Sequence, residues 1–201
     1  MTAHLGDLSS ASHYRVHLEF TAPREPDFSV RSMPFVSVIT EIEANSSSAR
    51  GEALRKQYNR IPYGSPLYWW EIHSSSGRVT CAYIGQTVRL QIRQRFKKHR
   101  TVLSLLAQYA NSPDECVMFR LCSRFDICYG NQRIAIEHLP PDQAAKVIND
   151  VEALLIFEKQ PILNVQHKRK RKTPWKPFVL ERVHLGQRCD WARNEDGMSR
   201  N

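Results

Sequence analysis

The most constraining feature of the sequence is a pair of apolar, aromatic-rich runs separated by a short polar segment. The first run, LYWWEI, covers residues 67–72, and the second, VTCAYI, covers residues 79–84. Between them lies SSSG at residues 74–77, a composition typical of a tight turn. Strands joined so closely pair as an antiparallel hairpin, which we expect to organise the fold. We expect one of Trp69 and Trp70 to be buried and the other exposed, where it could stack on a base.

Regular patterns flank this hairpin on both sides. Apolar residues alternate with polar ones over residues 13–20, which predicts a half-buried strand. Helical spacing of apolar residues predicts helices over residues 90–110 and 142–159. Residues 116–125 and 133–139 are further strand candidates. The pattern indicates the α/β class, in an α+β arrangement, with a three-stranded mixed or antiparallel sheet flanked by helices.

The chain is expected to have three parts. Residues 1–65 form an N-terminal extension with a strand and, over residues 46–60, a helix that Pro62 ends. Residues 66–166 form the central domain. Residues 167–201 begin with HKRKRKTPWK and form a basic C-terminal arm.

Composition limits the classes of function. Lys and Arg number 29 against 20 Asp and Glu, a formal charge of +9 that favours an anionic partner, of which nucleic acid is the commonest. No apolar run is long enough to cross a bilayer and no secretory signal is evident, so we expect no membrane partner and a cytoplasmic location. The five cysteines are an odd number without a C-x-x-C pair, which favours reduced, buried thiols. A zinc site would use Cys116, Cys122, Cys128 and His138, whose spacing matches no zinc module.

Positive charge gathers in two segments. The first contains Arg89, Arg93, Arg95, Lys97, Lys98 and Arg100, and the second contains Lys168, Arg169, Lys170, Arg171, Lys172 and Lys176. A run of charges is often only a solvated face or a targeting tract. The first segment also has an apolar face, so we expect it to be packed as a cationic ridge that can follow a phosphate backbone.

The motifs become specific around Tyr83. AYIGQT ends the second strand of the hairpin, PLYWWEI lies upstream, and R-F-K-K-H follows at residues 95–99. Further on, Glu152 is followed at fixed spacing by Pro161 and Asn164. In element order and in these positions, residues 66–166 resemble the GIY-YIG nuclease family. Pro66-Leu67-Tyr68 stands where that family has Gly-Ile-Tyr, so the glycine is missing and the hydroxyl remains.

The resemblance implies a site for phosphodiester hydrolysis. It assigns Glu152 as the protein ligand of one divalent ion, Mg²⁺ or Mn²⁺, with Glu158 as the weaker competitor. It places the Tyr83 hydroxyl beside the attacking water and makes Tyr68 the partner tyrosine. A phenol with a pKa of about 10 needs nearby cations to act as a base. Without the rest of the motif, each tyrosine would be interpreted as a core residue whose hydroxyl reaches solvent, and Glu152 as an exposed helix residue.

Two residues compete for the catalytic arginine. Arg93 has the commoner family spacing from Tyr83, whereas Arg95 precedes an aromatic residue and lies four residues before His99. Arg93 and Arg95 project about 200° apart on a helix, so they cannot share one site. We favour Arg95 as the phosphate ligand, with His99 as proton acceptor or relay. Gly85 would allow a bend or a close phosphate approach. Asn164 would have a structural role, capping the loop after the helix.

The expected function is therefore metal-dependent cleavage of double-stranded DNA by an endonuclease resembling a compact type II restriction enzyme. The alternatives are a non-specific effector, toxin or repair nuclease of the same fold, and a catalytically dead nucleic-acid-binding protein. Enzymes that cut palindromes commonly act as homodimers on DNA, because a twofold protein matches a twofold site. The oligomeric state stays open at this point.

Overall fold

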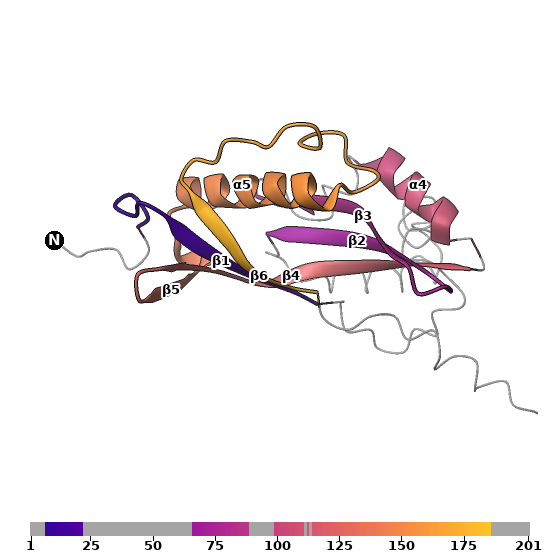
Figure 1. Ribbon diagram of the computed structural model, residues 1–201, viewed down its shortest axis with the longest axis horizontal. Coiled ribbons are helices and arrows are strands. Elements are labelled where there is room, and N and C mark those ends of the chain that lie inside the picture. Colours follow the sequence, from indigo (N-terminus) through magenta and orange to yellow (C-terminus); the bar gives the residue numbers. More distant parts are fainter. Residues whose placement is uncertain (1–6, 22–65, 89–98, 111, 113, 186–201) are drawn as a thin grey trace, which may run out of the picture.

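A computed structural model describes residues 7–21, 66–88, 99–110, 112 and 114–185 (Figure 1). Its elements are β1 (Tyr14–Thr21), β2 (Leu67–Ser74), β3 (Val79–Gln86), α4 (Arg100–Ala110), β4 (Glu115–Tyr129), β5 (Gln132–Ala135), the 3-10 helix η1 (Ile136–His138), α5 (Pro141–Lys159) and β6 (Phe178–His184). The arrangement is of mixed α and β class, as expected.

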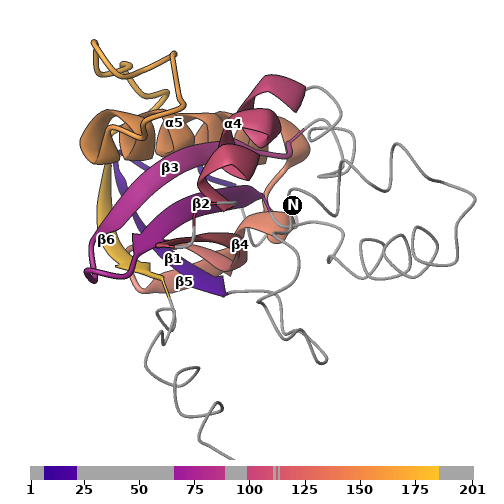
Figure 2. The same ribbon diagram turned by 90° about the vertical axis from the view of Figure 1, so that its right-hand side faces the viewer.

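The strands form one sheet in the order β3-β2-β4-β1-β6, with β5 paired to β4. β2 and β3 form the predicted hairpin, and β4 is long enough to pair with β2 in its first half and with β1 and β5 in its second. β6 runs parallel to β1. The sheet is larger than the three strands we expected, because β1 and β6, from the N-terminal extension and the C-terminal arm, join it. Figure 2 shows how strongly this sheet twists.

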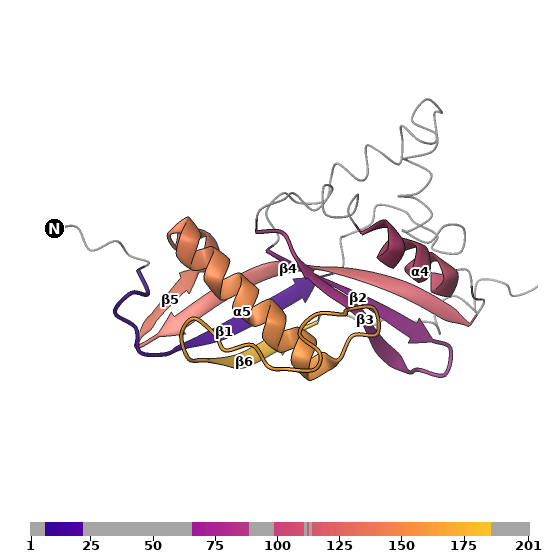
Figure 3. The same cartoon turned by 90° about the horizontal axis from the view of Figure 1, so that it is seen from above.

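One helix packs on each face of the sheet. Trp69 packs in the cluster that includes the buried stripe of α5, and Trp70 packs in the cluster that includes Leu106 of α4. Figure 3 shows α5 crossing the strands diagonally and α4 lying toward the other end of the sheet. The expectation of one exposed tryptophan is wrong: their exposed fractions are 2% and 1%. Successive strand residues point to opposite faces, and here both faces are covered.

The ends of α5 follow from its sequence. Pro141 occupies the first turn, where its missing N–H and fixed φ are compatible with the helix. Gln160 ends it in the left-handed conformation, at φ 49°, and its N–H donates to the Ile156 carbonyl. The predicted apolar stripe is buried at Val147, Ile148, Val151, Leu154 and Leu155. Neither helix of the described chain combines the length and apolarity needed to cross a bilayer.

Other predicted elements have mixed outcomes. The alternating residues 13–20 form β1, with all four of their apolar side chains buried. The helix predicted over residues 90–110 is described as α4 from Arg100 onward. The strand predicted over residues 133–139 ends at Ala135 and continues as η1. The helix predicted over residues 46–60 lies outside the described residues, and β6 was not predicted.

Candidate active site

A β-bulge decides where Tyr83 points. Trp70 pairs with Tyr83, but the next residue, Glu71, pairs with Cys81, so Ala82 is one extra residue in β3. A bulge of this kind reverses the alternation of the strand. Tyr83 therefore lies on the α4 face of the sheet, in the cluster with Tyr68 and Trp70, instead of on the face of Cys81.

Tyr68 and Tyr83 stack on this face. Tyr68 is directly opposite Gly85, so the two tyrosines are diagonal neighbours rather than a directly facing pair. Their ring centroids lie 6.0 Å apart, with an interplanar angle of 24°. Phe119 of β4 contacts Tyr68 at 6.2 Å between centroids, and Tyr68 is 1% exposed. The Tyr68 ring is therefore held in place from both sides.

Gly85 makes room for the Tyr68 ring. A Cβ atom at position 85 would overlap the Tyr68 Cζ and Oη atoms. The close approach of the Tyr68 ring on the neighbouring strand is thus a reason for glycine at this position of the YIG sequence.

His99 joins the tyrosine pair from the residue before α4. Its Nδ1 lies 3.4 Å from the Tyr83 hydroxyl oxygen, and the two ring centroids are 5.5 Å apart. A contact of this length between catalytic groups commonly shortens when substrate binds. The structure thus brings together three of the five residues that the sequence nominated: Tyr68, Tyr83 and His99.

Glu152 lies on α5, close to the end of β3 that carries Gly85. The link is a hydrogen bond of 3.2 Å from the Gln86 side chain to Asn149, one helical turn before Glu152. Residues three apart lie on the same side of a helix, so Glu152 is on the side of α5 that contacts this strand end. It is partly buried, whereas Glu158, its competitor, is exposed.

Asn164 fastens the loop after α5 to β3. Its side chain accepts from the Ile84 N–H and donates to the Ile84 carbonyl, both at 2.9 Å. Backbone bonds from Ile162 to the Cys81 carbonyl and from Leu163 to the Ala82 carbonyl extend this edge. The structural role predicted for Asn164 is confirmed, but its partner is the strand that bears Tyr83.

Much of the first basic segment lies outside the described residues, namely Arg89, Arg93, Arg95, Lys97 and Lys98. The choice between the two candidate arginines therefore remains a prediction. Arg100 is the first residue of α4. His99, which lies within this segment directly before Arg100, contacts Tyr83.

The second basic segment is packed along α5. Figure 1 shows the chain after α5 running back above this helix before it enters β6. Lys172 Nζ lies 2.7 Å from the buried carboxylate of Asp150. Lys168 is partly buried, and Arg169, Lys170 and Arg171 are exposed. Their charges are accessible to solvent, whereas that of Lys172 is matched by an acid.

Sequence reasoning missed a buried ionic cluster on β2 and β4. The Glu71 carboxylate accepts hydrogen bonds from His73 at 2.8 Å and from Arg120 at 2.9 Å, and all three residues are at most 4% exposed. Burial alone would raise the pKa of Glu71, but these hydrogen bonds and the Arg120 charge hold that pKa below its usual value. The available signal was an acid and a histidine two apart within an apolar strand.

The side chain of Cys116, one of the four residues of the zinc alternative, lies outside the described residues, so that alternative stays untested. Cys81, Cys122 and Cys128 are free thiols, and burial raises the pKa of Cys81 and of Cys122 to about 12. Within residues 7–21, 66–88, 99–112 and 114–185, as far as these are described, no three His, Cys, Asp or Glu side chains are grouped to hold a metal.

Comparison of the chain with protein-family models, with curated proteins and with solved structures gave no match in any of the three. The motif resemblance and the geometry around Tyr83 are therefore the basis for assigning a function.

Proposed function

We propose that the protein is a metal-dependent endonuclease of the GIY-YIG type that hydrolyses phosphodiester bonds in double-stranded DNA. The observation that carries the proposal is the contact of 3.4 Å between the Tyr83 hydroxyl and His99 Nδ1, beside the stacked ring of Tyr68. Core packing alone does not call for a histidine next to this hydroxyl. A phenol and an imidazole in contact form a path for one proton.

The tyrosine and the histidine would act as one proton-transfer unit. The Tyr83 oxygen takes a proton from the water that attacks phosphorus, and His99 Nδ1 takes the phenolic proton in turn. Arg95 would bind the scissile phosphate with its guanidinium group. Tyr68, fixed between Tyr83 and Phe119, holds the Tyr83 ring in place.

Glu152 suits one Mg²⁺ or Mn²⁺. Mg²⁺ is commonly held by one or two carboxylates, with water and substrate phosphate oxygens as the remaining ligands. Glu152 is partly buried, and α5 is tied to the end of β3 one turn before it. When bound, the ion would supply a positive charge that stabilises the leaving oxygen and the phosphate.

The exposed cations Arg169, Lys170 and Arg171, together with the basic composition of the first segment, support nucleic acid as the substrate. We further propose that the enzyme is cytoplasmic and resembles a type II restriction endonuclease that works as a homodimer. A non-specific nuclease of the same fold and a catalytically dead binder are the alternatives.

The test is digestion of plasmid and phage DNA with Mg²⁺ or Mn²⁺, followed by mapping of the ends. Discrete fragments are expected for a restriction enzyme, a smear indicates a non-specific nuclease, and no cleavage by folded protein refutes catalysis. Glu152→Gln should lower the cleavage rate by about 100-fold or more, because a metal ligand contributes several kcal/mol to transition-state stabilisation. Its matched control is Glu158→Gln, an exposed acid on the same helix, which should cleave at the normal rate.

A further inference from the structure

The basic segment after α5 is held as a loop of defined shape. Two residues that lead into it adopt the left-handed conformation, Gln160 at φ 49° and His167 at φ 63°. The Gln160 side chain donates to the Lys168 carbonyl at 3.0 Å and so closes the beginning of the loop. Sequence composition predicted a basic arm here, and the structure places it against the body of the protein.

The far end of the loop is anchored by a buried acid. Asp150 of α5 accepts a hydrogen bond from the Trp175 backbone N–H at 2.6 Å and pairs with Lys172 Nζ at 2.7 Å. Lys176 Nζ then donates to the carbonyls of Ser9 and Ala11 at 2.8 and 2.7 Å. The bond from Gln160 to Lys168 before the exposed cations and the contacts of Asp150 after them therefore fix the backbone on both sides.

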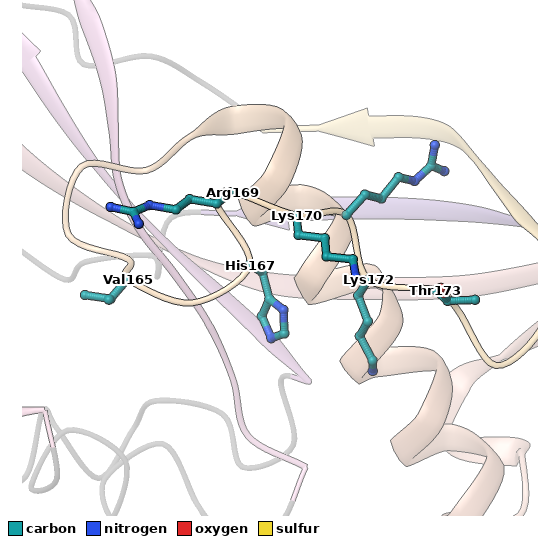
Figure 4. Close-up of a pocket in the computed structure, with 7 residues that line it drawn as sticks. Val165, His167, Arg169, Lys170, Lys172 and Thr173 are labelled. Carbon is teal, nitrogen blue, oxygen red and sulfur yellow. The ribbon is translucent and has the colours of Figure 1, made fainter.

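Between these anchors lies a shallow hollow with a volume of about 440 Å³ (Figure 4). Its lining residues are Val165, His167, Arg169, Lys170, Arg171, Lys172 and Thr173. None of them is acidic. Figure 4 shows His167, Lys170 and Lys172 following one another beside α5, and Arg169 extended toward Val165.

The lining indicates the class of ligand. Pockets for small organic molecules are mostly apolar and enclose the ligand, whereas Val165 is the one aliphatic residue of this lining and is itself 90% exposed. A concave surface lined by one sign of charge concentrates counter-ions of the other sign. Cations spread along an open loop match an extended polyanion better than a single small anion.

The loop is also connected to the proposed active site. Asn164, which bridges to the Ile84 backbone, immediately precedes Val165 at the rim of the hollow. Ile84 is the residue after Tyr83 on β3. A phosphate backbone bound in the hollow would therefore lie at a fixed offset from the Tyr83 hydroxyl.

We propose that residues 165–173 form a preformed clamp for the phosphate backbone of duplex DNA, and that Asp150 is the positioning residue that holds it in shape. This inference rests on the proposed function only in taking duplex DNA as the ligand. It adds that part of the binding energy comes from the fixed shape of the loop, beyond its charge.

Two variants of the full chain separate charge from shape. Arg169→Gln with Lys170→Gln removes two phosphate contacts, so the slope of log K against log salt should become shallower by about 2. Asp150→Asn keeps every cation and raises the net charge by one unit, so charge alone predicts tighter binding. If the clamp is preformed, this variant should bind a 20-base-pair duplex about 3–10-fold more weakly with an unchanged slope.

The binding measurements are made in EDTA, so they do not depend on cleavage. Gln160→Gly serves as a second anchor variant in case Asp150→Asn does not fold. Gly accepts the left-handed conformation, and the substitution removes the side-chain bonds to the carbonyls of Lys168 and Phe157. The clamp is supported if the anchor variants bind the duplex more weakly than wild type. Inorganic phosphate should also compete poorly with the duplex for the wild-type protein. Three results would overturn it. The double variant could keep the wild-type affinity and slope, the anchor variants could bind as tightly as wild type, or the wild-type protein could fail to bind the duplex. A wild-type protein that binds but never cleaves would refute the nuclease proposal and leave the clamp standing.

Discussion

The Tyr83 hydroxyl oxygen lies 3.4 Å from Nδ1 of His99, although the two residues belong to different elements, β3 and the segment that leads into α4. The β-bulge at Ala82 and the packing of α4 on the sheet together create this contact. It joins a phenol to an imidazole, so a proton can pass from one ring to the other.

His99→Ala should slow single-turnover cleavage by about 10²–10⁴-fold while DNA affinity stays near that of wild type, because the loss is in proton transfer. Tyr83→Phe should cause a similar loss. If the two act as one unit, the double variant should be no slower than the slower single variant. Losses that multiply would show that the two residues work independently.

Gly85→Ala should destabilise the protein by about 1–3 kcal/mol, because the new Cβ would overlap the buried Tyr68 ring. Urea unfolding measures the effect. In a Tyr68→Val background the ring is gone, so Gly85→Ala should cost little there. An equal cost in both backgrounds would contradict the proposed steric cause.

Asn164→Ala should lower the free energy of unfolding by about 1–3 kcal/mol for each Ile84 backbone group that is left buried without its partner. Equilibrium unfolding in urea checks the stability. Gln166→Ala, an exposed position two residues further along the chain, is the matched control and should unfold like wild type. If both variants unfold alike, Asn164 does not fasten the loop to β3.

Glu71→Gln should lower the free energy of unfolding at pH 7 by about 3–5 kcal/mol, because it leaves the Arg120 charge buried without its acid. The pKa of Glu71 is lowered in the folded protein, so its contribution is present above the pKa of the unfolded state and is lost as the pH falls. The difference between wild type and variant should therefore shrink on acidification.

Glu181→Gln provides the comparison for that experiment. Glu181 pairs with Arg15 and His17 on the solvent-exposed side of β1 and β6. Exposed pairs of this kind contribute little to stability. A variant at Glu71 that lowers the free energy of unfolding at pH 7 no more than the one at Glu181 does would disprove the role given to the buried cluster.

Local patterns were sufficient for the elements whose signals are short-range. The hairpin of β2 and β3 follows from two apolar runs and a polar turn, and α5 follows from a regular stripe with prolines at both ends. The sequence did not predict strand β6, because its pairing with β1 skips Glu181: Val16 pairs with Leu180 and His17 pairs with Arg182. That irregularity breaks the period of two on which strand prediction depends.

The candidate site divides in the same way. Residue types and spacing nominated Tyr68, Tyr83, His99 and Glu152 before any geometry was known. They suggested that the two tyrosines face each other in the hairpin, but not the one-residue bulge that turns Tyr83 to the face of Tyr68, because such a bulge leaves no local signal. Nor could they show that both tryptophans are buried, which depends on α4 and α5 covering opposite faces of the sheet.

The sequence by itself determined the chemical groups, the hairpin and the main helix, because backbone preferences and apolar periodicity act over a few residues. Only the tertiary structure decided that Asn164 bonds to Ile84, that Asp150 anchors the basic loop, and that Glu71 meets Arg120. The residues are 80 apart for Asn164 and Ile84, 49 apart for Glu71 and Arg120, and 25 apart for Asp150 and Trp175. Such contacts form through the packing of the whole chain, where the burial of a polar group requires a partner from elsewhere in the sequence.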